Sequence, residues 1–378
     1  MQVSQVVLKS GDIIPAQLDS LKALSPNLVL VFGSVELLES VAVPLANSFP
    51  SAIRVGCSTA GEISAEGVSD KTCVVTALRF DASQLVESST RLAGMEDSQA
   101  AGRRLSQQLP LAGLRAVLIL GQGVAINGSA LIAGMTEVLG NSIPITGGLA
   151  GDAAAFKETW VLDNTGLHND SLVCVGLYGE KLSFTHGSFG GWSPFGPARK
   201  VTRCDHNVLF ELDGEPALDV YKLYLGDHAK DLPASGLLFP FAMLGSDHSE
   251  VGLIRTILGV DEEAGSLTLA GDIDPAGYLR LMHASTDALV DGAETAAHAA
   301  QKALDSEGQG LALLVSCVGR KLVMGGRVDE EVEAVGDVFG QRAVLAGFYS
   351  NGEISPFTGN AECKLHNQTM TITYISEA

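Results

Sequence analysis

The stretch SFTHGSFGGWSPFGP, residues 183–197, combines side chains that could hold a flat, apolar ligand. It contains one imidazole, His186, in a chain of which only 6% is aromatic. Its rings belong to Phe184, Phe189, Trp192 and Phe195. A buried strand would alternate apolar and polar residues, and a plain surface loop has no use for so many rings. The composition therefore predicts a loop that lines a pocket in the C-terminal half.

A second set of residues could bind a polar molecule. An acid follows a glycine at the end of a predicted strand three times, at Glu62, Asp152 and Glu353. One interpretation is that each carboxylate accepts hydrogen bonds from backbone N–H groups of its own turn. The other is a rim of polar side chains that faces a ligand. On that interpretation the ligand loops contain Ser58, Thr59, Glu62, Asp152, Ser350 and Glu353.

Nucleophilic chemistry has one candidate, Cys57 in the glycine-rich turn VGCSTAGE. An attacking thiol needs a neighbouring base or cation to lower its pKa, and none stands near Cys57 in the sequence. A small buried core residue is the commoner role for such a cysteine. The sequence also lacks GxGxxG, GK[ST], GxSxG and HExxH patterns. We therefore do not expect an enzyme.

The elements that position these residues recur three times along the chain. Residues 28–80, 116–179 and 311–375 each contain an apolar strand, a periodic helix, a second apolar strand ending in a glycine-rich turn, and a closing β-rich run. Short Val, Ile and Leu runs around a periodic helix are typical of βαβ units. We therefore predict an α/β fold of mixed sheets, built from recurring βαββ units.

Length and the change of pattern predict two domains, residues 1–180 and residues 181–378. Residues 181–291 interrupt the repeats. Within that segment, 252–260 and 265–273 are predicted to form a hairpin around the acidic turn DEEAG.

Composition narrows the classes of partner. A formal net charge of −20 would repel nucleic acid and anionic lipid, so we expect a small molecule or a protein as partner, and no membrane. The six cysteines form no CxxC pair, which indicates neither a disulfide framework nor a zinc site. No secretory signal or long apolar run is present, so a cytoplasmic location is predicted.

Several motifs together resemble the FIST sensory family. THGSFGGWSPFGPARKVTR, LFELDGEPALDVYKLYLG and GFYSNGEI are similar to its C-terminal half, and GCSTAGEI and GGLAGD are similar to its N-terminal half. The His-Gly-Ser-x-Gly-Gly-Trp form resembles the NosP-type members. That resemblance implies non-covalent haem b, sensing of nitric oxide, and regulation of a histidine kinase or a cyclic-di-GMP enzyme.

The resemblance gives the first stretch a specific meaning. A neutral imidazole is the usual axial ligand in haem proteins that bind diatomic gases, so His186 would hold the iron, with His283 as the second choice. Flanking glycines would let the macrocycle approach the backbone. The apolar faces would come from Phe189, Trp192 and Phe195, and the propionates would pair with Arg199, Lys200 and Arg203. A packed, hydrogen-bonded histidine is the alternative.

Two functions follow from these observations. The first is a haem-binding sensor of nitric oxide, or of haem itself, that acts in trans on a kinase or cyclic-di-GMP enzyme. The second is a haem-free sensory module that binds a small, amino-acid-like molecule through the strand-end loops. Both are compatible with a homodimer.

Overall fold

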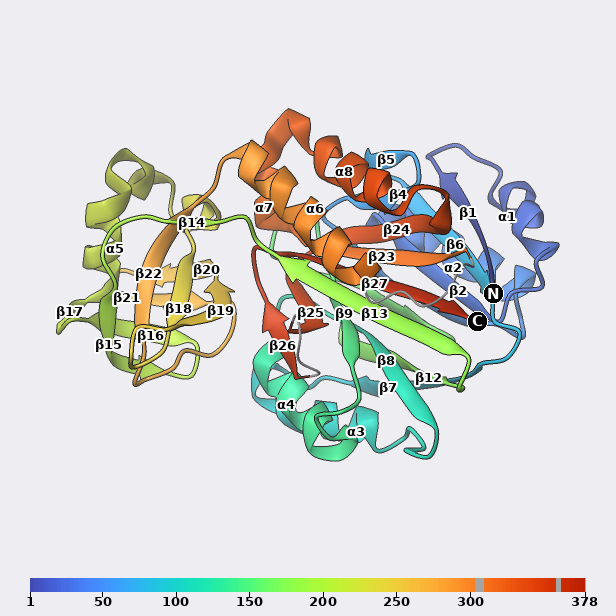
Figure 1. The fold of residues 1–378 in the computed structure, drawn as a ribbon, viewed down its shortest axis with the longest axis horizontal. Helices are drawn as coiled ribbons and strands as arrows, with labels where there is room; N and C mark the ends of the chain where they lie inside the picture. The colour runs from blue at the N-terminus through green and yellow to red at the C-terminus, as the bar shows by residue number, and fades with distance from the viewer. Residues whose placement is uncertain (303–308, 358–361, 378) are drawn as a thin grey trace.

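The computed structural model describes residues 1–302, 309–357 and 362–377, and it contains three six-stranded sheets with the same strand order (Figure 1). The first sheet runs, from edge to edge, through β1 (Gln2–Leu8), β6 (Cys73–Arg79), β2 (Leu28–Gly33), β3 (Ile53–Ser58), β10 (Val161–Asp163) and β11 (Gly166–His168). In β2, every residue of LVLVFG is buried, as expected for a parallel strand covered on both faces.

The other two sheets repeat this order. The second consists of β7 (Gln84–Arg91), β12 (Ser171–Tyr178), β8 (Leu114–Gly121), β9 (Ile145–Leu149), β25 (Gly352–Pro356) and β26 (Cys363–His366). The third consists of β13 (Leu182–Phe189), β27 (Met370–Glu377), β23 (Gly310–Cys317), β24 (Ala343–Ser350), β4 (Glu62–Ser64) and β5 (Gly67–Ser69). The predicted recurrence of one βαββ unit is thereby confirmed, and each unit gains an additional strand and helix at its start.

Each repeat donates its short hairpin to the sheet of another repeat. Strands β4 and β5, from the first repeat, extend the third sheet beside β24, because β4 pairs with β24. The β10–β11 hairpin of the second repeat joins the first sheet beside β3, and the β25–β26 hairpin of the third joins the second sheet beside β9. The exchange is cyclic and gives the assembly an approximate threefold symmetry.

Helices cover the outer face of each sheet, and the inner faces meet in a common core. The helices are α1 (Ile14–Lys22) and α2 (Val35–Ser48), α3 (Ser98–Ser106) and α4 (Gly128–Leu139), and α6 (Thr286–Lys302), α7 (Val318–Met324) and α8 (Asp329–Phe339). At the centre, Phe32 of the first repeat stacks on Phe348 of the third, with ring centroids 4.7 Å apart. The three repeats therefore form a single packed body.

Three backbone hydrogen bonds join the strand ends around the symmetry axis. The N–H of Ala60 donates to the carbonyl of Tyr349 (2.8 Å), and the N–H of Asn351 donates to that of Leu149 (3.2 Å). The N–H of Gly151 closes the ring by donating to the carbonyl of Ser58 (2.9 Å). Because each donor lies two residues after an acceptor of its own repeat, these bonds fix which residues of the three repeats are equivalent.

A fourth, nine-stranded sheet interrupts the third repeat between β13 and α6 (Figure 1, left). It contains β14 (Ser193–Pro194), β15 (Arg199–Asp205), β16 (Val208–Leu212), β17 (Glu215–Pro216), β18 (Phe241–Leu244), β19 (Glu250–Arg255), β20 (Ile257–Asp261), β21 (Ser266–Leu269) and β22 (Tyr278–His283), with α5 (Ala217–Leu225) packed against it. We name residues 190–285 the insert. The predicted hairpin around DEEAG is confirmed, because β20 pairs with β21.

The expectation of a loop over residues 183–197 is wrong for its first half, because residues 182–189 form β13, an edge strand paired with β27. Gly187 explains the difference: a Cβ at this position would lie 2.0 Å from the carbonyl oxygen of Ala296, so the glycine allows α6 to pack directly on the strand. The proposed limit at residue 180 falls between β12 and β13, where the second repeat ends; as a domain boundary it stays a prediction.

Candidate ligand-binding site

His186 is half-buried in the middle of β13, opposite Thr373 of β27. Its Nε2 lies 3.3 Å from the carbonyl oxygen of Phe357. Burial lowers the pKa of His186, and it lowers the pKa of the neighbouring His366 to about 4. Both imidazoles are therefore neutral near pH 7.

The predicted aromatic partners of His186 do not converge on it. Phe189 is 48% exposed, and the indole N–H of Trp192 donates to the carbonyl of Gln368 (2.7 Å). Phe195 lies in the insert, edge-on to Tyr224 and to His283, the exposed last residue of β22.

Two of the three predicted propionate partners, the arginines, are engaged by acids of the insert. Arg199 forms an ion pair with Asp213 (3.1 Å), and Arg203 forms one with Glu211 (2.9 Å). Phe195 and Arg199 border a void of only about 10 Å³, enough for at most one water molecule. His186 lines neither this void nor the two large cavities described below. The described arrangement therefore does not fit a haem at His186.

The strand-end acids of the first and third repeats occupy equivalent, buried positions. Glu62, 1% exposed, accepts hydrogen bonds from the hydroxyl of Thr59 (2.5 Å) and from the N–H and hydroxyl of Thr72 (3.1 and 2.8 Å). Glu353, which is fully buried, accepts the same set from Ser350 (2.9 Å) and Thr369 (3.1 and 2.9 Å). Burial raises the pKa of both carboxyls, that of Glu353 to about 8.

The acid of the second repeat has a different position. Asp152 directly follows Gly151, the donor of its repeat in the ring of backbone hydrogen bonds, whereas Glu62 and Glu353 each lie two residues after their donor. Its carboxylate accepts three backbone N–H groups, from Phe156 (2.8 Å), Lys157 (2.6 Å) and Glu158 (3.1 Å). Ser58 also forms a hydrogen bond with the backbone, in which its hydroxyl donates to the carbonyl of Gly151 (2.7 Å). All of these polar side chains thus stabilise turns.

Three of the strand-end residues also border a cavity of about 570 Å³, which we name the strand-end cavity. Segments of all three repeats line it, at the carboxyl ends of β2, β3, β9 and β23. Its lining comprises Ser34, Val35, Glu36, Thr59, Ala60, Gly61, Glu62, Asp70, Lys71, Asp152, Ala153, Ala154, Val318, Lys321, Leu322 and Gly325. In open α/β sheets, ligands bind at this end of the strands.

Lys321 of α7 brings a largely buried cation into the strand-end cavity. Its side chain is 16% exposed; its Nζ donates to the carbonyl of Ala60 (2.8 Å) and forms an ion pair with Asp70. A Cβ at residue 61 would lie 2.5 Å from this Nζ, so Gly61 leaves the space that the ammonium occupies. The exposed Glu36 and Lys71 form no ion pair within the described residues, and they add a charge of each sign to the lining.

The loops around the strand-end cavity hold unusual backbone conformations. Lys71 (φ 58°), Ala153 (φ 56°) and Ala154 (φ 66°) adopt the left-handed region without being glycine. Such conformations cost on the order of 1 kcal/mol each and gather at ligand sites.

The sequence indicated Thr59, Glu62 and Asp152 of this cavity but not Lys321. The available signal was that α7 begins directly after β23, which places its first turn at the carboxyl end of a strand. Ser58, Ser350 and Glu353, which the sequence grouped with these residues, do not line the cavity.

Other chemistry finds little support in the described residues. Cys57 is buried, and burial raises the pKa of its thiol well above the usual value, so the thiol is not activated. Within residues 1–302, 309–357 and 362–377, no three His, Cys, Asp or Glu side chains gather as a metal site would require. No helix in those ranges has the length and apolar character needed to cross a bilayer.

Comparison with family models matches the FIST N domain to residues 27–215 and the FIST C domain to residues 217–356. An uncharacterized protein of Methanocaldococcus jannaschii is 33% identical over 96 residues, which are 25% of this chain and 19% of that protein. Among solved structures, cyanuric acid hydrolase from A. caulinodans aligns over 99% of both chains with a TM-score of 0.36 and 10% identity, values too low to carry an argument.

Proposed function

Because this chain belongs to the FIST family of sensory domains, whose two models together reach from residue 27 to residue 356, we propose that it senses a small polar molecule bound in the strand-end cavity. The observation that carries the proposal is the meeting of segments from all three repeats at this one cavity of about 570 Å³. A ligand there would contact every repeat and could change how they pack.

The lining indicates a ligand with both a negative and a positive group. Lys321 and Lys71 supply cations, whereas Glu36 and Asp70 supply carboxylates on the same cavity. Small side chains, Ala60, Ala153 and Ala154, leave room between these charges. An amino-acid-like molecule, with a carboxylate and an ammonium, matches this charge pattern and is small enough to fit in the cavity volume of about 570 Å³.

The first prediction concerns Lys321. In a thermal-shift screen of the proteinogenic amino acids, followed by calorimetry of the best ligand, Lys321→Gln should weaken binding about tenfold or more, because a charge-assisted hydrogen bond to the ligand is lost. Lys222→Gln is the matched control: Lys222 pairs with Glu262 on the surface of the insert and should bind like the wild type. Equal affinity of Lys321→Gln and wild type would overturn the assignment of the cavity.

The more specific proposal, a haem sensor of nitric oxide acting on a histidine kinase or cyclic-di-GMP enzyme, rests on the His-Gly-Ser-x-Gly-Gly-Trp resemblance. One structural feature supports it: burial keeps His186 neutral, the form that ligates iron. The surrounding side chains do not form a haem pocket, so we place this function second.

An absorption spectrum decides between the two proposals. If haem binds at His186, protein purified with haem supplied should show a Soret band that His186→Ala removes, while unfolding of the haem-free protein changes by no more than about 1 kcal/mol, the value of its one long hydrogen bond. A wild-type spectrum without a Soret band would remove the haem proposal and leave the polar ligand standing.

A further inference from the structure

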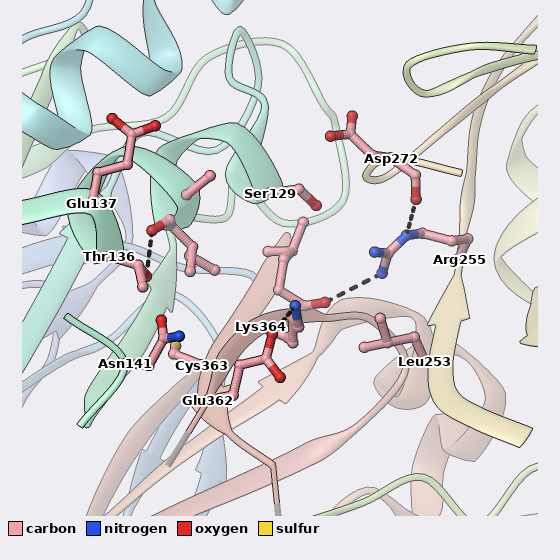
Figure 2. A pocket seen from close by; sticks show the side chains of 13 residues that line it. Ser129, Thr136, Glu137, Asn141, Leu253, Arg255, Asp272, Glu362, Cys363 and Lys364 are labelled. Carbon is pink, nitrogen blue, oxygen red and sulfur yellow. Dashed lines mark hydrogen bonds and ion pairs between the residues drawn. The ribbon is translucent and has the colours of Figure 1, made fainter. Parts of the chain in front are cut away.

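A second large cavity lies where the insert meets the body (Figure 2). Its volume is about 580 Å³. One wall is α4 with the residues that follow it, a second is the β25–β26 hairpin, and the third belongs to the insert. Its lining comprises Ser129, Ile132, Ala133, Thr136, Glu137, Asn141, Leu253, Arg255, Asp272, Glu362, Cys363, Lys364 and Leu365. We name it the junction cavity.

Arg255, the last residue of β19, brings a buried guanidinium to the junction cavity. The residue is only 4% exposed. Its Nε donates to the backbone carbonyl of Asp272 (3.1 Å), and its Nη1 donates to those of Ile254 and Leu365 (both 3.2 Å). Figure 2 shows the guanidinium of Arg255 held beside Asp272 at the edge of this space.

The guanidinium keeps unused hydrogen-bonding capacity. Arginine has five N–H donors, and none of those on Nη2 has a partner among the described residues. No carboxylate of the described residues lies within ion-pair distance of Arg255. The side chain of the neighbouring Asp272 is directed to Asn127, whose Nδ2 donates to it (3.0 Å). Three neutral carbonyls therefore position the cation, and the nearby carboxylate of Asp272 attracts it from beyond ion-pair distance.

Such an arrangement is costly for the unliganded protein. A buried charge is normally paired, because transfer from water to a protein interior removes its hydration. Burial lowers the pKa of Arg255 to about 10, which still leaves it charged at neutral pH. The other cation of the cavity, Lys364, already pairs with Glu362. An anionic ligand would therefore be drawn to Arg255.

The remaining lining describes the rest of such a ligand. Thr136 and Asn141 offer uncharged hydrogen-bonding groups, while Ile132, Leu253 and Leu365 offer apolar contact. A small organic molecule would use both kinds of surface. Its anionic end would accept a charge-assisted hydrogen bond from Nη2, since Nε and Nη1 are already engaged, and a carboxylate is an anionic group that a small organic molecule can carry.

We propose that the junction cavity binds a small organic carboxylate, with the carboxylate on the free Nη2 of Arg255 and the remainder against α4 and the β25–β26 hairpin. The bound molecule would contact the body and the insert at once and hold them together. This site is separate from the strand-end cavity, shares no lining residue with it, and does not depend on the function proposed for it.

Succinate is the probe, and neutral succinamide is its isosteric control. In chloride-free buffer we expect saturating succinate to raise the Tm of the full chain by about 3 °C, through preferential binding to the folded state, and succinamide to leave it unchanged. Arg255→Gln should weaken succinate binding, measured by calorimetry, about tenfold or more. Arg199→Gln, in the same insert but paired with Asp213, should bind like the wild type.

A second variant keeps the test decisive if Arg255→Gln fails to fold. Ser129→Phe adds a ring to the cavity wall on α4 without removing the guanidinium, and it should also abolish succinate binding. Wild-type protein that ignores succinate, or variants that bind it as well as the wild type, would overturn the proposal. A rise in Tm with phosphate but not with succinate would overturn the carboxylate assignment.

Discussion

His366 links the stability of the fold to pH. The ring is buried beneath Phe357, and its Nε2 lies 3.0 Å from the carbonyl oxygen of Ser355. Burial is the main cause that lowers its pKa from 6.5 to about 4, with Arg255 and His186 as lesser causes. Below pH 6.5 the unfolded chain therefore takes up a proton that the folded chain refuses.

The sign of this effect gives a prediction. Stability that depends on the neutral ring is present above pH 6.5 and is lost as the pH falls toward 4, by about 3 kcal/mol in total. Urea unfolding of the wild type and of His366→Gln between pH 7.5 and 4 measures it: the difference between the two proteins should shrink as the pH falls. Glu353, whose pKa is raised, contributes in the opposite sense in both proteins, so the difference isolates His366. A pH-independent difference would contradict the prediction.

Single residues also show why the sequence identified only part of the candidate site. Thr59, Glu62 and Asp152 could be found because a glycine-rich strand end marks each of them. Lys321 and Arg255 carry no such mark, since their importance comes from burial against segments distant in the chain. His186 stood out by its neighbours in sequence, but alternation along β13 and the path of the insert turn those neighbours away from it.

Among the elements, the two parallel strands of each repeat approach each other closely at one glycine. A Cβ on Gly56, Gly147 or Gly347 would lie 1.8 to 2.0 Å from the carbonyl oxygen of the facing residue on the neighbouring strand. These glycines are equivalent under the threefold arrangement, each two residues before an acceptor of the backbone ring. The strand ends can meet at the axis only if these side chains are absent.

We therefore expect Gly56→Ala and Gly347→Ala to lower the free energy of unfolding by about 3 kcal/mol or more, because backbone must move to admit the methyl group. Gly326→Ala is the control: its Cβ meets nothing within 4 Å, so the change should be neutral or slightly stabilising. Chemical denaturation of the three variants makes the comparison. A similar, small effect in all three would show that the strands are not closely packed there.

The elements themselves were largely predictable, whereas their partners were not. Apolar runs and helical periodicity identify β2, β8 and β23 with the helices that follow them. The hairpin strands have only three to five residues, too few to specify a sheet, and their exchange between repeats leaves no local signal. Helical segments at 100–109 and 293–304, which correspond to α3 and α6, could also be found before two of the copies, but the first strand of each repeat was not assigned to it, and in the third repeat the insert separates β13 from α6.

On the scale of the whole molecule, the junction cavity and the strand-end cavity lie in different structural settings. The strand-end cavity is enclosed by the repeats alone, whereas the junction cavity also depends on the insert. Two backbone segments connect the insert to the body (Figure 1). Polar contacts also join the two parts, such as the hydrogen bond from Asn127 of the body to Asp272 of the insert. Occupancy of the first cavity should therefore alter packing within the body, and occupancy of the second should alter how firmly the insert is held.

The cyclic exchange of hairpins also imposes an order on biosynthesis. When the first two repeats have left the ribosome, the β4–β5 hairpin still lacks β24, and β9 still lacks β25. One late stretch, residues 343–356, supplies both missing partners. Until it is translated, the nascent chain exposes unpaired strand edges, the feature most prone to association between chains. Folding of the body can therefore be completed only after residues 343–356 have been translated, and a chaperone that covers strand edges would act on the interval before that.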